Sequence, residues 1–270
     1  MSLAAHRLGQ GTWFMGDHPA RRREEIAALR EGIALGLALI DTAEMYGDGR
    51  AESLVAEAIA GLREKAYLVT KVLPSNASRR GVARSCEASL RRLKTDRLEC
   101  YLLHWMGSHP LEETVRGFED LVQAGKILSW GVSNLDLSEM KRLMKVAGGE
   151  ACAANQVLYN LSRRGIEFDL LPWSRERGMP VMAYSPVEQG RLLGHKAIKA
   201  VADRLGATPA QVALAWTLRQ PGVVSIPKAG RVEHVRENRK ALDLKLDAEA
   251  LQALDAAFPP PKKAHPLEML

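Results

Sequence analysis

Short apolar segments alternate with longer segments of helical spacing along the whole chain. In the longer segments apolar residues recur every three or four positions, which is typical of amphipathic helices. Ser78 and Thr208 stand directly before two of these segments, where residues that cap a helix N-terminus are expected. The pattern predicts eight strands, at residues 8–12, 37–41, 66–71, 98–104, 127–133, 153–157, 180–184 and 223–227. It predicts a helix after each strand, at residues 21–35, 51–60, 79–93, 111–124, 137–146, 168–177, 209–219 and 232–242.

This alternation of strands and helices is typical of an α/β protein with a parallel sheet. A length of 270 residues suits either two domains of ordinary size or one large barrel. No low-complexity linker divides the chain, so we expect a single domain over residues 1–270. A dinucleotide-binding open sheet would carry G-x-G-x-x-G after the first strand, and Gly9, Gly11 and Gly16 do not have that spacing. The sequence therefore predicts a TIM (β/α)8 barrel.

Composition narrows the class of protein without changing this architecture. Hydrophobic residues make up 46% of the chain and charged residues 26%, as in ordinary globular proteins. The three cysteines lie far apart, and neither a secretion signal nor a membrane segment is evident, so we expect a cytoplasmic protein. The net charge of +6 permits a polyanionic partner, but the basic residues of 79–92 recur at helical spacing without interleaved aromatic residues. We therefore expect a small anion, such as a phosphorylated cofactor, rather than nucleic acid.

Polar and titratable residues stand where the predicted strands end. In a TIM barrel the C-terminal ends of the strands surround one active site. Asp41, Lys71 and His104 end three successive strands. Contact with solvent explains any single polar residue there, whereas three titratable groups around one mouth indicate chemistry. Polar or aromatic residues also stand at the other strand ends, or within a strand in the case of Gln156: Thr12, Trp13, Ser133, Asn134, Gln156, Tyr184, Ser185 and Lys228.

Tyr46, five residues after Asp41, suggests a specific mechanism. A tyrosine with an ordinary pKa of ~10 is a poor acid at neutral pH unless a nearby cation stabilises its phenolate. In this hypothesis Lys71 supplies the cation, Asp41 orients Lys71, and His104 hydrogen-bonds the oxygen of a carbonyl substrate. Such a set is suited to protonating the alkoxide that forms when a hydride is delivered to a carbonyl.

Eight local motifs fall in order along the chain: LGQGTW, IDTAEMYGDGRAESLVAEAI, VTKV, LLHW, GVSN, NQVLYN, AYSPV and IPKAGRVEHVRENRKAL. With these motifs the sequence resembles the aldo-keto reductase superfamily over nearly its whole length. The resemblance implies a TIM barrel that reduces aldehydes and ketones with NADPH. Within the superfamily the chain is most similar to bacterial reductases of the diketogluconate and methylglyoxal type.

The resemblance also implies roles for individual residues. The implied catalytic tetrad, with Tyr46 as proton donor, is Asp41, Tyr46, Lys71 and His104. The residues implied to surround the substrate are Trp13, Tyr46, His104 and Trp105. The nicotinamide carboxamide would be held by Ser133, Asn134 and Gln156, the ring stacked on Tyr184, and the pyrophosphate lined by Ser185, Pro186 and Val187. The adenosine end would be surrounded by Lys228, Ala229, His234, Glu237 and Asn238. The remaining implied cofactor contacts are Gly11, Thr12, Trp13, Asp41, Gly190, Ile226, Pro227 and Arg231.

Two departures from the superfamily pattern affect these expectations. Ala229 and His234 replace a serine and an arginine that bind the 2′-phosphate in many relatives, and a mostly neutral imidazole is no match for a guanidinium. Because Lys228 remains and Arg231 is near, NADPH stays the expected cofactor, with NADH use as the alternative. Only eight residues precede Gly9, so we expect the N-terminal hairpin of the family to be shortened or absent.

Two other functions stay open from the sequence. A lysine at a barrel strand end is also a candidate Schiff-base nucleophile, which would make the protein an aldolase acting through Lys71. Some relatives act as cofactor-sensing subunits of ion channels, and a fold alone does not exclude that role. We expect no metal site, because the remaining histidines form no ligand cluster, and we expect a monomer. The proline-rich ending PPPKKAHPLEML is typical of a loose tail rather than a substrate lid.

Overall fold

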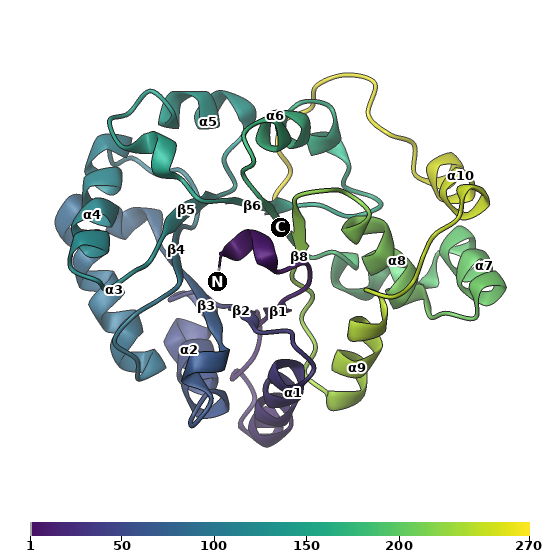
Figure 1. The fold of residues 1–270 in the computed structure, drawn as a ribbon, viewed down its shortest axis with the longest axis horizontal. Helices are drawn as coiled ribbons and strands as arrows, with labels where there is room; N and C mark the ends of the chain where they lie inside the picture. Colours follow the sequence, from purple (N-terminus) through teal and green to yellow (C-terminus); the bar gives the residue numbers. More distant parts are fainter. Residues whose placement is uncertain (1) are drawn as a thin grey trace.

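The computed structural model describes residues 2–270, and its centre is an eight-stranded parallel sheet in which each strand pairs with the next along the chain (Figure 1). The strands are β1 (Gln10–Gly11), β2 (Leu39–Asp41), β3 (Tyr67–Val72), β4 (Cys100–Leu103), β5 (Trp130–Ser133), β6 (Asn155–Leu158), β7 (Val181–Tyr184) and β8 (Val223–Ser225). Parallel bridges from Leu8 to Ser225 and from Gly11 to Lys228 join the first strand to the last. The sheet therefore closes on itself, and the predicted TIM barrel is confirmed.

Helices surround this barrel (Figure 1). They are α1 (Arg22–Ala34), α2 (Arg50–Ala58), α3 (Arg79–Leu93), α4 (Leu111–Gln123), α5 (Leu137–Leu143), α6 (Leu170–Glu176), α7 (Lys196–Leu205), α8 (Pro209–Leu218), α9 (Val232–Lys240) and α10 (Ala248–Ala257). Ser78 and Thr208 cap α3 and α8 by accepting backbone hydrogen bonds from Gly81 and Gln211, as the sequence predicts. Helices α7 and α10 were not predicted; they pack against each other outside the ring.

Short 3₁₀ turns connect many of these elements. They are η1 (Leu3–Ala5), η2 (Pro19–Arg21), η3 (Tyr46–Gly49), η4 (Arg63–Lys65), η5 (Pro74–Asn76), η6 (Gly149–Ala151), η7 (Gly165–Glu167) and η8 (Glu188–Gly194). Every strand but β8 starts one to three residues later than the sequence pattern predicts. Most of the predicted strand residues that lie before the observed strands flank the regular hydrogen-bonded ladder. Two of them, Leu8 and Leu98, still form isolated β-bridges.

The single turn η1 precedes β1 within the described residues, at the position for which the sequence predicts a shortened or absent hairpin. Figure 1 shows this turn over the centre of the barrel, beside the label of the N-terminus. Leu3 is 4% exposed and belongs to the cluster that fills the barrel interior. The other buried members of that cluster are Leu39, Tyr67, Val69, Cys100, Leu102, Ala154, Met182, Val224 and Ile226. One buried leucine thus closes the bottom that a hairpin would otherwise cover.

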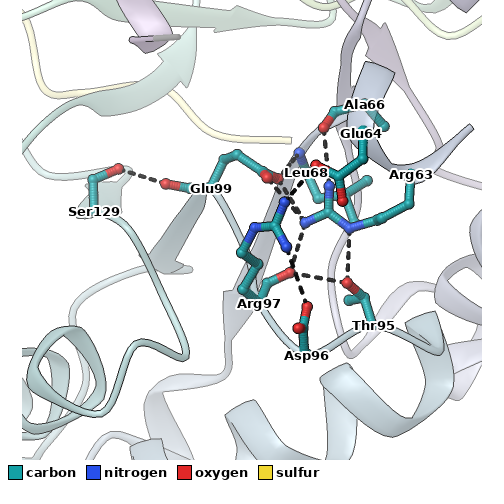
Figure 2. A network of polar contacts seen from close by, with 9 residues as sticks. All are labelled: Arg63, Glu64, Ala66, Leu68, Thr95, Asp96, Arg97, Glu99 and Ser129. Atoms are coloured by element: carbon teal, nitrogen blue, oxygen red, sulfur yellow. Dashed lines mark hydrogen bonds and ion pairs between the residues drawn. The ribbon is translucent and has the colours of Figure 1, made fainter.

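A polar network also fastens the bottom of the barrel, at the N-terminal ends of β3, β4 and β5 (Figure 2). The Arg63 guanidinium lies 2.9 Å from a carboxylate oxygen of Glu99 and donates to the carbonyl oxygens of Ala66 and Arg97. Glu99 in turn accepts from the backbone N–H of Leu68, and its own carbonyl accepts from Ser129. The network thus joins the starts of three neighbouring strands.

A second, larger apolar cluster lies between the sheet and the helices. Trp130, Trp173 and Trp216 are buried there, as their positions within predicted elements suggest, and Cys86 is fully buried. No helix within residues 2–270 is long and apolar enough to cross a membrane.

The C-terminal segment 259–270 contains neither helix nor strand, yet it contacts the barrel. Its Glu268 carboxylate lies 2.5 Å from the Arg163 guanidinium, and Leu267 packs against the main apolar cluster. The segment is therefore an anchored strap and not the loose tail that its composition suggests.

Candidate active site

Four side chains from neighbouring elements meet at the C-terminal ends of β2, β3 and β4. Asp41 is the last residue of β2, Lys71 lies near the end of β3, His104 follows β4 directly, and Tyr46 begins η3. The Lys71 Nζ lies 2.8 Å from Asp41 Oδ2, 2.8 Å from the Thr42 carbonyl oxygen and 3.1 Å from the Tyr46 hydroxyl. These three contacts use all three donors of the ammonium group. The structure therefore brings the predicted tetrad together.

The turn that carries Tyr46 has an unusual backbone. Gly47, Asp48 and Gly49 all have positive φ, of 56°, 52° and 84°. Three consecutive left-handed residues demand glycine or a short polar side chain, which the sequence Gly-Asp-Gly provides. The turn places the centroid of the Tyr46 ring 4.8 Å from the Lys71 Nζ.

Burial and charge compete at the Tyr46 and Lys71 pair. Burial lowers the pKa of Lys71, but Asp41 and the Tyr46 hydroxyl outweigh it and raise that pKa above its ordinary value. Burial raises the pKa of Tyr46, the Lys71 charge lowers it and Asp41 raises it, and the net pKa lies above the ordinary value. The expected stabilisation of the phenolate by Lys71 is present, but desolvation exceeds it, so Tyr46 is protonated at neutral pH.

His104 contacts the Tyr46 ring edge-on, with ring centroids 5.8 Å apart. Burial, aided by the charge of Lys71, lowers the pKa of His104 to about 2. The imidazole is therefore neutral at physiological pH and carries one N–H donor. Its buried Nδ1 has no hydrogen-bond partner among the described residues.

A hydrogen-bonded chain of amide and hydroxyl groups continues from the tetrad across β5, β6 and β7. Gln156 donates to Asp41 Oδ1 over 2.7 Å, and Ser133 donates to the Gln156 carbonyl over 2.9 Å. Asn134, in the left-handed region at φ 58°, donates to the His104 carbonyl and accepts from the half-buried Tyr184 hydroxyl. All the residues predicted to contact a nicotinamide therefore lie side by side at the mouth.

The segment after β7 forms a tight loop in which Ser185, Glu188 and Gln189 have positive φ. Glu188 is 4% exposed and accepts hydrogen bonds from Asn160, Arg163 and Arg191. The sequence predicts that Ser185, Pro186, Val187 and Gly190 of this loop contact the cofactor, but it does not predict the burial of Glu188. Two of its partners, Asn160 and Arg163, come from the segment after β6, and only Arg191 is near in sequence.

The region between β8 and α9 is more open. Lys228 is exposed and forms no ion pair within residues 2–270, whereas Arg231 lies 3.4 Å from Glu24 at the surface. His234 is exposed, Ala229 is buried, and Glu237 accepts a hydrogen bond from Thr208, the cap of α8. The residues predicted for an adenosine end thus share one region, but Glu237 already has a structural partner.

The two tryptophans predicted to line the substrate site, Trp13 and Trp105, are half-buried. Trp105 follows His104, with ring centroids 4.8 Å apart, and Trp13 follows β1. Trp13 stacks on Phe14 at 4.3 Å, and Phe14 is 55% exposed with φ 64°. Sequence reasoning missed Phe14, although an apolar residue beside a strand end is a recognisable signal. Among residues 2–270, no group of three His, Cys, Asp or Glu side chains is placed to hold a metal ion.

Comparisons with known proteins agree with this geometry. The aldo/keto reductase family model matches residues 7–258. The chain is 52% identical over 268 residues to methylglyoxal reductase YeaE of Escherichia coli strain K12, covering 97% of this chain and 94% of that protein. It is 31% identical over 233 residues to glyoxal reductase of Bacillus subtilis strain 168, covering 86% and 83%. A crystal structure of an aldo/keto reductase from Klebsiella pneumoniae in complex with NADP and acetate matches with a TM-score of 0.96 at 53% identity, covering 98% and 95%. The resemblance carried by the sequence motifs is confirmed, and the chain belongs to the aldo/keto reductase family.

Proposed function

We propose that this protein reduces small aldehydes, ketoaldehydes or keto-sugars to alcohols with NADPH, and that Tyr46 is the general acid. The observation that supports this most directly is the 3.1 Å contact between the Tyr46 hydroxyl and the Lys71 ammonium. The same ammonium also donates a hydrogen bond to Asp41. The names of the E. coli and B. subtilis relatives support small dicarbonyl compounds as substrates.

The donor set at the barrel mouth fits a nicotinamide cofactor. Ser133, Asn134 and Gln156 offer hydroxyl and amide groups that match a carboxamide, and the half-buried Tyr184 offers an aromatic face. When bound, the cofactor would supply the hydride that adds to the substrate carbonyl carbon. The NADP held by the K. pneumoniae relative supports the same assignment.

Tyr46 is suited to deliver the proton because it is protonated before the reaction. Its raised pKa retains the proton, yet an alkoxide is a stronger base than a phenolate, so transfer to the alkoxide is favourable. Lys71 stays charged and stabilises the phenolate that remains, while Asp41 balances the charge of Lys71. The neutral His104 donates a hydrogen bond to the carbonyl oxygen and does not compete as the acid.

The same electrostatics oppose an aldolase. A Schiff-base lysine attacks as the neutral amine, which requires a lowered pKa. Lys71 has a raised pKa and uses all three donors on Asp41, Thr42 and Tyr46.

The adenosine end supports NADPH as the preferred cofactor. Lys228 has no carboxylate partner within residues 2–270, and the ion pair of Arg231 with Glu24 is exposed and therefore weak. Both cations are thus available to a 2′-phosphate. We expect slower turnover with NADH.

The test is cofactor oxidation with methylglyoxal and with an aromatic aldehyde. Tyr46→Phe should lower kcat by about 10²–10⁴-fold while NADPH still raises the melting temperature. Tyr67→Phe removes a hydroxyl from the interior cluster below the mouth and is the matched control, with kcat expected within twofold of the parent. Near-parental turnover of Tyr46→Phe would contradict the assignment of the acid, and faster turnover with NADH would contradict the cofactor preference.

A further inference from the structure

An ion pair between a buried carboxylate and a half-buried arginine lies behind the tetrad, on the helix side of β3. Glu52 of α2 is fully buried, and one of its carboxylate oxygens lies 2.5 Å from the Nε of Arg92 of α3. Its other oxygen accepts a hydrogen bond from the Thr70 hydroxyl over 2.6 Å. A carboxylate buried this deeply is costly unless such partners compensate it. Among residues 2–270, neither Glu52 nor Arg92 forms a hydrogen bond or ion pair with a residue of the tetrad.

Arg92 also contacts the end of the turn that carries Tyr46. A Cβ built on Gly49 would lie 2.5 Å from the Arg92 Cδ and 2.6 Å from its Nε, so the arginine side chain packs directly on the Gly49 backbone. From within α2, the Ser53 hydroxyl donates to the Gly49 carbonyl over 3.1 Å. Gly49 is thus held by α2 and α3 at the point where the turn enters α2.

Glu52 connects this turn to the strand that carries Lys71. Thr70 immediately precedes Lys71 in β3, and side chains alternate between the two faces of a strand. Thr70 therefore points outward to Glu52 while Lys71 points inward to Asp41 and Tyr46. The Glu52 carboxylate thus connects β3, through Thr70, to the Arg92 side chain that packs on the turn 46–49. The separation of β3 from this turn sets the 3.1 Å contact between Tyr46 and Lys71.

We propose that Arg92 and Glu52 are positioning residues that hold the Tyr46 hydroxyl against the Lys71 ammonium. This inference rests on the proposed role of Tyr46 as the general acid. Without the Arg92 contact, the turn 46–49 relaxes away from β3 and the contact between Tyr46 and Lys71 lengthens. Binding of cofactor and carbonyl does not depend on that contact, so the loss falls on the proton-transfer step.

The test variant is Arg92→Met, which keeps an apolar stem on Gly49 and removes the guanidinium. We expect kcat for methylglyoxal reduction to fall at least tenfold, with KM for NADPH and for the carbonyl within twofold. Arg79→Met is the matched control, because Arg79 lies on the same helix and its ion pair with Asp120 is exposed. The control should leave kcat within twofold. A fall of less than twofold for Arg92→Met, or an equal fall for Arg79→Met, overturns the proposal.

Combining variants separates positioning from a general structural role. If Arg92 acts through Tyr46, Arg92→Met should cause less than a twofold further loss in the Tyr46→Phe background, because coupled residues are non-additive. A tenfold loss in both backgrounds overturns the proposal. Should Arg92→Met not fold, Thr70→Val removes the hydroxyl with nearly the same shape and is expected to give the same split between kcat and KM. Retained turnover of Tyr46→Phe alone would instead contradict the proposed function, so the two failures are distinguishable.

Discussion

Two ion pairs occupy opposite ends of the barrel and resemble each other in geometry. At the mouth, Lys71 lies 2.8 Å from Asp41, and at the bottom, Arg63 lies 2.9 Å from Glu99. Side-chain exposure is 0% and 3% for the first pair, and 17% and 12% for the second. The first pair joins β2 to β3, and the second joins the turn η4 to the start of β4, so distance and charge alone do not distinguish them.

Their remaining partners do distinguish them. Arg63 directs its other donors to Thr95 and to the carbonyl oxygens of Ala66 and Arg97, which join backbone segments (Figure 2). Lys71 directs one donor to the Tyr46 hydroxyl, a group that can lose a proton. A buried ion pair is therefore a sign of chemistry when it touches a further titratable group at an open end of the fold. The Arg63 pair satisfies backbone carbonyls and serves stability.

The largest effect that separates the two ends is expected from Lys71→Met. The phenolate of Tyr46 would lose its neighbouring cation, and we expect kcat for carbonyl reduction to fall about 10³-fold, within the range for acid–base groups. Steady-state kinetics at saturating NADPH and methylglyoxal measures this loss. NADPH binding, followed by thermal shift, should persist. A loss confined to KM would show that Lys71 binds substrate and does not assist the acid.

Arg63→Met should instead lower the stability of the protein and leave its turnover nearly unchanged. Removing one partner of a largely buried pair leaves Glu99 uncompensated, so the free energy of unfolding should fall by about 3 kcal/mol, with kcat of the folded protein within twofold. Urea unfolding and kinetics on the same preparation provide both numbers.

Arg97→Met is the matched control within the network of Figure 2. Its partners Glu64 and Asp96 are 78% and 83% exposed, so we expect a change below about 1 kcal/mol. Equal losses for Arg63→Met and Arg97→Met would contradict the structural role assigned to the Arg63 pair.

The comparison also explains which features could be predicted from sequence. Asp41, Lys71 and His104 were predictable because strand ends of a barrel converge on one mouth, whatever the shapes of the loops. Arg63 and Glu99 gave no such signal, since turn and strand-start residues meet only through the packing of β3 against β4. Arg92 and Glu52 come from two helices and were missed for the same reason.

Elements outside the repeating unit were also missed. Helix α7 is an additional helix between β7 and α8, and α10 is an additional helix after α9, so a pattern of one helix per strand does not include them. Asp247, which caps α10 by accepting from Ala250, was nevertheless a readable start signal. The tail beyond α10 was predicted from composition to be loose, but the contact between Glu268 and Arg163 depends on a partner about a hundred residues away.

The last prediction concerns the pH dependence of stability that arises from the buried histidines at the two ends, His6 and His104, which are 7% and 8% exposed. Burial lowers the pKa of both, to about 2 for His104. Because an unfolded histidine titrates near 6.5, the unfolded state binds more protons below that pH, and stability falls as the solution is acidified. For His104 the slope is about 1.4 kcal/mol per pH unit below pH 6. Urea unfolding at pH 7, 6 and 5 should show a shallower fall for both His6→Gln and His104→Gln, whereas only His104→Gln should lower kcat. An unchanged slope in His104→Gln would mean that the imidazole has the same pKa in the folded and unfolded states, and would contradict the lowering of that pKa by burial.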